Sequence, residues 1–145
     1  MNMNVKTPWH LWAVGGVSLL WNAFGAVDYT MTKLKNMSYL AGMTPEQQAF
    51  LFGFPLWANV GWALGVWGSL IGSLLLLARS RHAVAAFAIS LLGLAINSAY
   101  QFGVKGAELQ QLFGIGPMIF TAVIAAIIIA LLLYARAMAA KGVLR

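Results

Sequence analysis

Four stretches of the chain are long and apolar enough to cross a membrane, and they constrain its fold more than any other feature. They cover residues 8–29, 55–78, 83–104 and 115–135, and Asp28 is the only Asp, Glu, Lys or Arg within them. A spanning helix needs about 20 mainly apolar residues. Backbone groups in lipid must bond within their own segment, which favours helices. The sequence therefore predicts an all-α polytopic membrane protein, a single four-transmembrane-helix bundle.

Composition excludes the other broad classes of protein. Hydrophobic residues make up 61% of the 145 residues and charged residues only 8%, whereas a soluble domain carries about 25% charged residues. So few charges could not cover a soluble core, and disorder needs low hydrophobicity and high charge. The lipid bilayer is therefore the first partner that the sequence predicts.

Motifs for catalysis and for metal binding are missing from the sequence. There is no cysteine, which excludes disulfides, thiolate metal sites and thiol nucleophiles. His10 and His82 are both predicted near one membrane surface, and no carboxylate accompanies them there. No nucleophile motif and no glycine-rich phosphate loop occurs. We expect no enzymatic activity, no cofactor and no metal site.

A short helix is predicted before the second span. Thr44-Pro45-Glu46-Gln47 has the form of a capping box, in which Gln47 closes the box, and Gly53 and Pro55 should end the helix. We expect an interfacial helix over residues 45–53, although the second span could instead extend this far. It would carry three apolar side chains toward lipid: Phe50, Leu51 and Phe52.

The first span begins with a similar signal. Thr7-Pro8 reads as an N-cap followed by proline at the first helical position. Lys6 before an apolar run could alternatively mark a signal peptide. Trp12 and Trp21 make a poor signal core, so we expect the segment to be retained as a span.

Charge predicts the orientation. With four spans, both termini and the 79–82 turn share one side, which carries six cations and no acid: Lys6, Arg79, Arg81, Arg136, Lys141 and Arg145. The other side carries three lysines and three acids. The positive-inside rule then predicts that both termini are cytoplasmic. The cations do not form the clustered patch that nucleic acid requires, so no nucleic-acid partner is expected.

Small residues line one face of the second span. Gly61, Gly65, Gly68 and Gly72 follow one another at spacings of four, three and four, which places them on one helical face. Such a face lets helix backbones approach closely in lipid. The sequence predicts a helix-packing seam here, which could be static or could serve sliding or gating.

Polar side chains gather in the outer halves of the first three spans. Seven residues form a candidate ligand-binding pocket: Asn22, Asp28, Asn59, Trp62, Asn97, Tyr100 and Gln101. Amides in such a pocket suit a neutral solute with hydroxyl or amide groups. The same amides could instead bond across helices as structural glue. Asp28 could be a proton or cation site, or a carboxylate paired with Lys33 or Lys35.

The fourth span has almost no polar side chain between Thr121 and Tyr134. It is therefore predicted to face lipid or a partner protein. This apolar span and the glycine seam favour a membrane protein that acts by helix packing, as a homo-oligomer or as an accessory subunit of a larger membrane complex. The alternative is a carrier or binding protein for a small neutral, sugar-like solute that uses the outward-facing polar pocket.

Several segments between residues 7 and 102 resemble a family of small bacterial four-span membrane proteins. They are Thr7-Pro8-Trp9-His10-Leu11-Trp12, Trp21-Asn22-Ala23-Phe24-Gly25-Ala26, Asp28-Tyr29-Thr30-Met31-Thr32, Met43-Thr44-Pro45-Glu46-Gln47 and Trp62-Ala63-Leu64-Gly65-Val66-Trp67-Gly68. Members of this family, mostly from alphaproteobacteria, carry an uncharacterised or "sugar transporter" label. The resemblance implies a multi-pass protein of the bacterial inner membrane and adds transport to the expected functions.

Overall fold

The computed structural model describes residues 6–145, and these residues form helices and no strands. Four long helices are apolar enough to cross a membrane: α1 (Trp9–Lys33), α3 (Leu56–Leu77), α4 (His82–Ser98) with its π-helical continuation η1 (Ala99–Val104), and α6 (Gly116–Ala140). Two short helices, α2 (Pro45–Phe52) and α5 (Gly106–Phe113), complete the described fold. The predicted all-α bundle of four spans is confirmed.

The helix ends follow the predicted spans closely, with four differences. Helix α1 continues about one turn beyond residue 29 to Lys33, and Pro8 rather than Thr7 is its N-cap, without a side-chain hydrogen bond. The last helix continues to Ala140. Helix α5 was not predicted, because it has no side-chain cap to signal its start, whereas the equally short α2 has a capping box. It ends at Gly114, whose φ of +70° suits glycine.

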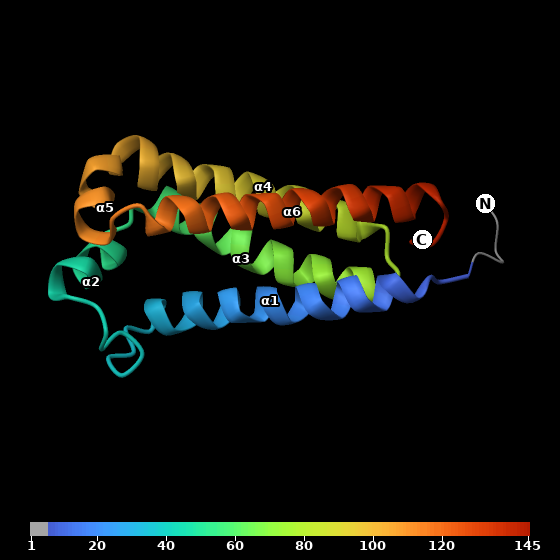
Figure 1. Cartoon of the computed structure of the whole chain (residues 1–145), viewed down its shortest axis with the longest axis horizontal. Helices are drawn as coiled ribbons and strands as arrows, with labels where there is room; N and C mark the ends of the chain where they lie inside the picture. The colour runs from blue at the N-terminus through green and yellow to red at the C-terminus, as the bar shows by residue number, and fades with distance from the viewer. Residues whose placement is uncertain (1–5) are drawn as a thin grey trace.

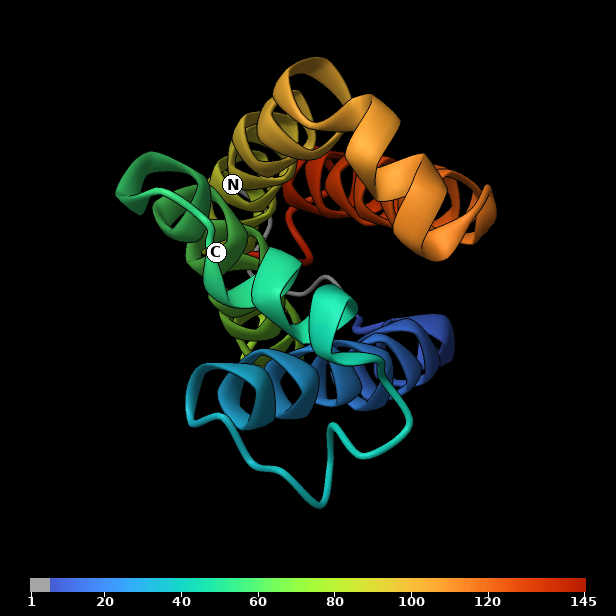
Figure 2. The same cartoon turned by 90° about the vertical axis from the view of Figure 1, so that its left-hand side faces the viewer.

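Both ends of the described chain lie at one end of the bundle, beside the turn between α3 and α4 (Figure 1). Backbone hydrogen bonds join the last residue to that turn: Arg145 N–H donates to Arg79 O at 2.9 Å, and Arg81 N–H donates to Arg145 O at 3.2 Å. At the same end, His10 Nδ1 of α1 lies 2.5 Å from Tyr134 Oη of α6. The loop 34–44, α2 and α5 lie at the opposite end (Figures 1 and 2).

Helices α3 and α4 form the central pair, and the predicted glycine seam is the surface along which they meet. A Cβ atom added to Gly61 would lie 2.9 Å from the backbone nitrogen of Asn97, and one on Gly72 would lie 2.6 Å from the Phe87 ring. Gly93 of α4 approaches from the other side, where an added Cβ would lie 2.5 Å from Gly65 N. The seam therefore packs the two backbones together, as expected for small residues in lipid.

The outer pair of helices attaches to opposite sides of this centre. Helix α1 packs on α3, and α6 packs on α4. The α1–α3 contact is partly polar, because Ser18 Oγ lies 2.8 Å from Ser73 Oγ in a buried position. The α4–α6 contact is apolar and joins Phe87 to a core cluster with Leu131 and Ala135. The four spans therefore follow the order α1, α3, α4, α6 around the bundle (Figure 2).

The outer end of the bundle is covered by a second apolar cluster. Phe50 of α2 is buried and packs against Phe54 and against Phe113 of α5, with ring centroids 5.8 Å and 6.0 Å apart. The Gln47 side chain donates to Leu112 O at 2.7 Å, which joins α2 to α5. The predicted capping box between Thr44 and Gln47 is confirmed. The expectation that α2 turns Phe50 toward lipid was wrong, because bundle aromatics cover that side chain.

Substitution of Gly93 tests the close approach of α3 and α4. Gly93→Ala places a Cβ 2.5 Å from Gly65 N and 2.6 Å from Gly61 O, so the helices must move apart. We expect a loss of about 1 to 3 kcal/mol in unfolding free energy, typical of overpacking, measured by thermal unfolding in detergent. Gly16→Ala is the matched control, since nothing lies within 4 Å of its added Cβ. Equal stability of the two variants would contradict this packing.

Candidate functional site

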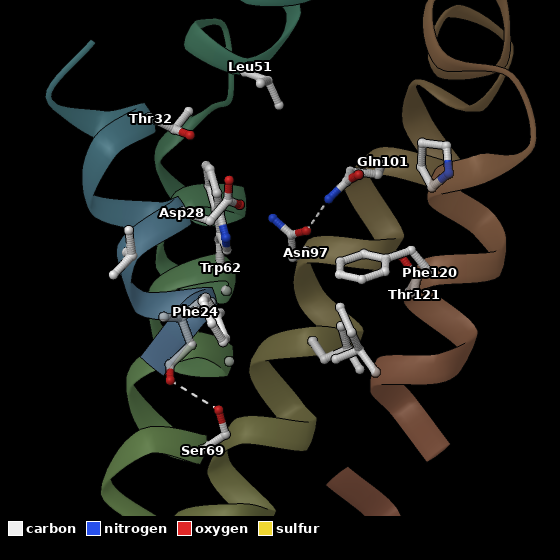
Figure 3. A pocket seen from close by; sticks show the side chains of 18 of the residues that line it. Phe24, Asp28, Thr32, Leu51, Trp62, Ser69, Asn97, Gln101, Phe120 and Thr121 are labelled. Atoms are coloured by element: carbon white, nitrogen blue, oxygen red, sulfur yellow. Dashed lines mark hydrogen bonds between the residues drawn. The ribbon is translucent and has the colours of Figure 1, made fainter. Parts of the chain in front are cut away.

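A cavity of about 930 Å³ lies in the outer half of the bundle, between α1 and α6 and against α3 and α4. Figure 3 shows side chains from these helices pointing into it: Phe24 and Asp28 from α1, Trp62 from α3, Asn97 and Gln101 from α4 and η1, and Phe120 and Thr121 from α6. The cavity exists because α1 and α6 attach to different members of the central pair. It is near the upper end of the range for small-molecule sites, about 300 to 1,000 Å³.

Most of the cavity wall is apolar. Trp62 and Val66 of α3, Leu94 of α4 and Ile124 of α6 contribute to it. At the outer end five more side chains line it, from the loop 34–44, α2 and α5: Tyr39, Met43, Leu51, Leu109 and Phe113. The predicted pocket was a polar one that opens outward. The structure differs, because polar groups form a minority of the lining and the short helices lie across the outer end.

Asn22 lies at the deep end of the cavity and also holds α1 against α3. Its buried amide nitrogen donates to Ser69 O at 3.0 Å and to Ser73 Oγ at 2.9 Å. Its amide oxygen accepts no hydrogen bond from any described residue. This oxygen is not fully buried, and Asn22 lines the cavity. Asn22 therefore combines the two predicted roles, structural hydrogen bonding and a polar position in the pocket.

Asn97 and Gln101 form the polar group at the centre of the cavity wall. Asn97 Nδ2 donates to Ala58 O of α3 at 3.1 Å, and Asn97 Oδ1 accepts a hydrogen bond from Gln101 Nε2 (Figure 3). Gln101 lies in η1, where the Lys105 N–H bonds to Tyr100 O, five residues back. Such wider turns are common at functional sites. Among the described residues, the Gln101 amide oxygen has no donor and faces the cavity.

Asp28 lies on the cavity rim, and its partner is a tyrosine. Tyr39 Oη donates to Asp28 Oδ1 at 2.5 Å, which fastens the loop 34–44 to α1. This hydrogen bond, together with burial, raises the pKa of Tyr39 to about 12, so its hydroxyl keeps its proton at all ordinary pH values. The alternative that Asp28 pairs with Lys33 or Lys35 was wrong. Lys33 instead donates to Asn59 Oδ1, and its ammonium lies 5.0 Å from the Trp62 ring centroid.

Two of the seven predicted site residues lie outside the cavity. Asn59 accepts from Lys33 and donates from Nδ2 to Phe54 O at 3.0 Å, so it supports the turn before α3. Tyr100 is buried in the outer apolar cluster, with its ring centroid 5.0 Å from Phe54 and 5.6 Å from Trp57. The structure brings the other five together: Asn22, Asp28, Trp62, Asn97 and Gln101.

The wall from α6 was missed by sequence reasoning. Phe120, Thr121 and Ile124 line the cavity, but an unbroken apolar helix gives no signal for which face meets a cavity and which meets lipid. Phe120 faces Trp21 of α1 across the space between the two helices, with ring centroids 6.2 Å apart and ring planes tilted by 51°.

The cavity lining contains few charged groups. No lysine or arginine lines the cavity, Asp28 contributes one carboxylate, and the amide oxygens of Asn22 and Gln101 have no donor among the described residues. Within residues 6–145, no group of three or more His, Cys, Asp or Glu side chains could hold a metal ion. The arrangement therefore suits a ligand that donates hydrogen bonds, and it disfavours an anionic one.

Comparison of the chain with protein-family models, with curated proteins and with solved structures finds no match in any of the three. The resemblance to small bacterial four-span proteins therefore stays a prediction from the sequence.

Two substitutions test whether Asn22 stabilises the helix packing more than Gln101 does. Asn22→Leu removes two hydrogen bonds to α3, and each interhelical bond in a membrane protein contributes about 0.6 to 2 kcal/mol. Gln101→Leu is the matched control, because the Gln101 side chain bonds only to Asn97 among the described residues. We expect Asn22→Leu to lower the unfolding free energy in mixed micelles by about 1 to 3 kcal/mol and Gln101→Leu to change it by less. The reverse order would contradict these roles.

Proposed function

We propose that this protein is a non-enzymatic binding or carrier protein of the membrane, whose cavity holds a small uncharged molecule. The observation that carries the proposal is the Asn97–Gln101 pair, set in the apolar wall of a 930 Å³ cavity. Ligand sites are typically apolar pockets with a few placed polar groups, which fix the ligand's orientation. The absence of cations from the lining supports a neutral ligand over an anionic one.

The proposed location is the bacterial inner membrane, with both termini in the cytoplasm. The end of the bundle that holds the termini carries Arg79, Arg81, Arg136, Lys141 and Arg145. The opposite end carries lysines and acids in equal number. This difference supports the orientation through the positive-inside rule. In this proposed orientation the cavity lies in the half of the bundle away from the cytoplasm.

Ligand titrations of the full chain in lipid nanodiscs test the proposed binding. The probes are glucose and octyl glucoside, kept below its micelle concentration, and the readout is tryptophan fluorescence, since Trp21 and Trp62 line the cavity. We expect a saturable change with at least one probe. Ile124→Phe, which fills the cavity, should abolish this change, and Gln101→Leu should weaken binding about tenfold, or about 1.4 kcal/mol.

Ile129→Phe is the matched control, because Ile129 lies on the same helix, is exposed and does not line the cavity. It should bind as the unmodified chain does. Unchanged binding by Ile124→Phe would overturn the proposed function, and so would the absence of saturable binding with every neutral probe, monoacylglycerols included.

The second candidate function is assembly, as a homo-oligomer or an accessory subunit. Helix α6 supports this candidate. Among the other spans, only α4 makes an extended contact with α6, and α6 is the least buried of the four spans. Native mass spectrometry from mild detergent distinguishes the candidates. A defined oligomer or a stoichiometric partner supports assembly, whereas a monomer argues against it.

A further inference from the structure

The proposed function leaves open how a ligand reaches the cavity. Side chains of the loop 34–44, α2 and α5 cover its outer end, and the Tyr39–Asp28 hydrogen bond fastens that loop to α1. Toward the termini, a buried apolar cluster with Leu11, Leu76 and Phe87 fills the bundle. The remaining side is the space between α1 and α6 (Figure 2), and in a membrane this side of a four-span bundle borders the bilayer.

The contacts between α1 and α6 are few and weak in this region. The one hydrogen bond between these helices among the described residues joins His10 to Tyr134, at the end that holds the termini. In the outer half, the Trp21–Phe120 ring contact is the only aromatic pair that links them in the described chain. Phe24 and Phe120 on the rim are 75% and 57% exposed. In a membrane these exposed rings contact acyl chains, so the opening is bounded by lipid.

We propose that the cavity binds a neutral single-chain lipid with a hydroxyl-bearing headgroup, and that this lipid enters from the bilayer between Trp21 and Phe120. The proposal rests on the proposed function and specifies its ligand and the route of entry. A lipid is already dissolved in the medium that borders the opening, whereas a sugar would have to cross the covered outer end.

The polar atoms of the cavity select the headgroup. Asn22 Oδ1 and Gln101 Oε1 have no donors among the described residues, and hydroxyl groups supply such donors. Asp28 adds a carboxylate at the rim, and no lysine or arginine lines the cavity. A phosphate headgroup would therefore lose its hydration without gaining a cation, which is costly.

The apolar walls select the chain. Phe24, Val66, Leu94 and Ile124 are among the apolar residues that line the cavity together with the amides. A bare sugar would leave several hydroxyl groups against these walls without partners, and each such group costs free energy. An acyl chain covers the same walls favourably. The lining therefore fits one polar head and one apolar chain better than a fully polar molecule.

A cross-link across the opening tests the route of entry. The chain has no cysteine, so the double variant Trp21→Cys with Phe120→Cys can be joined by a short, reducible bis-methanethiosulfonate linker. The matched control is His10→Cys with Tyr134→Cys, which joins the same two helices where they already touch. Both proteins are placed in nanodiscs and mixed with liposomes that contain 1-monooleoylglycerol. Native mass spectrometry follows occupancy with time.

We expect the cross-link at residues 21 and 120 to slow loading with 1-monooleoylglycerol at least tenfold, and reduction of the linker to restore it. The cross-linked control should load as the unmodified chain does. In equilibrium titrations, 1-oleoyl lysophosphatidic acid should bind at least tenfold more weakly than 1-monooleoylglycerol. Asp28→Asn should reduce this difference.

The outcomes separate the two proposals. If glucose or octyl glucoside binds but 1-monooleoylglycerol does not, the lipid assignment is wrong and the proposed function stands. If 1-monooleoylglycerol loads equally fast with the linker in place, lateral entry is wrong. If the lysophosphatidic acid binds as tightly, the headgroup assignment is wrong. If none of the neutral probes binds, the proposed function itself fails.

Discussion

The close approach of α3 and α4 determines the rest of the structure. Gly61 and Gly65 on one helix and Gly93 on the other leave no room for side chains between the backbones. Because the two helices fit so closely, each has one remaining side for another span, and α1 and α6 occupy these sides separately. The two outer helices are thereby held apart over half their length, and the space between them becomes the cavity. The close contact between α3 and α4 is thus accompanied by a cavity between α1 and α6.

The polar side chains inside the membrane serve packing and the cavity at once. Asn22 and Asn97 both use their amide nitrogens to bond α3, to Ser69 O and to Ala58 O. Their placement follows from cost, since a buried polar group without a partner is unfavourable in lipid. In Asn22 the fold uses both N–H groups of the amide nitrogen, so its oxygen is the atom that remains for a ligand. For this side chain, the two alternatives in the sequence, interhelical hydrogen bonding and ligand binding, are therefore compatible.

Much of the fold could be predicted because lipid imposes simple rules on a sequence. Span length, the seam from Gly61 to Gly72 and the capping box at Thr44 each follow from a local pattern, and each is present in the structure. The candidate site was predicted less well. The side on which Asn59 and Tyr100 lie depends on how α2 and η1 bend the chain at the outer end. Local patterns do not contain that information.

The contacts that helices α1 and α6 make with the rest of the chain could not be predicted either. The Asp28–Tyr39 bond depends on the path of an eleven-residue loop, and the wall from α6 depends on the rotation of an apolar helix with no polar face. Rotation of such a helix is set by shape complementarity with α4, as in the contacts of Leu131 and Ala135 with Phe87. Shape arises only when both surfaces are present, so one sequence segment read alone cannot reveal it.

The contact between His10 and Tyr134 has a mechanical consequence. It fixes α1 to α6 at the end where the C-terminal residue is also bonded to Arg79. A small change in the angle between two helices that are joined at one end produces a larger displacement farther along them. Any widening of the space between α1 and α6 would thus be larger near Phe24 and Phe120 than at the His10–Tyr134 contact, while the positively charged end of the bundle keeps its shape.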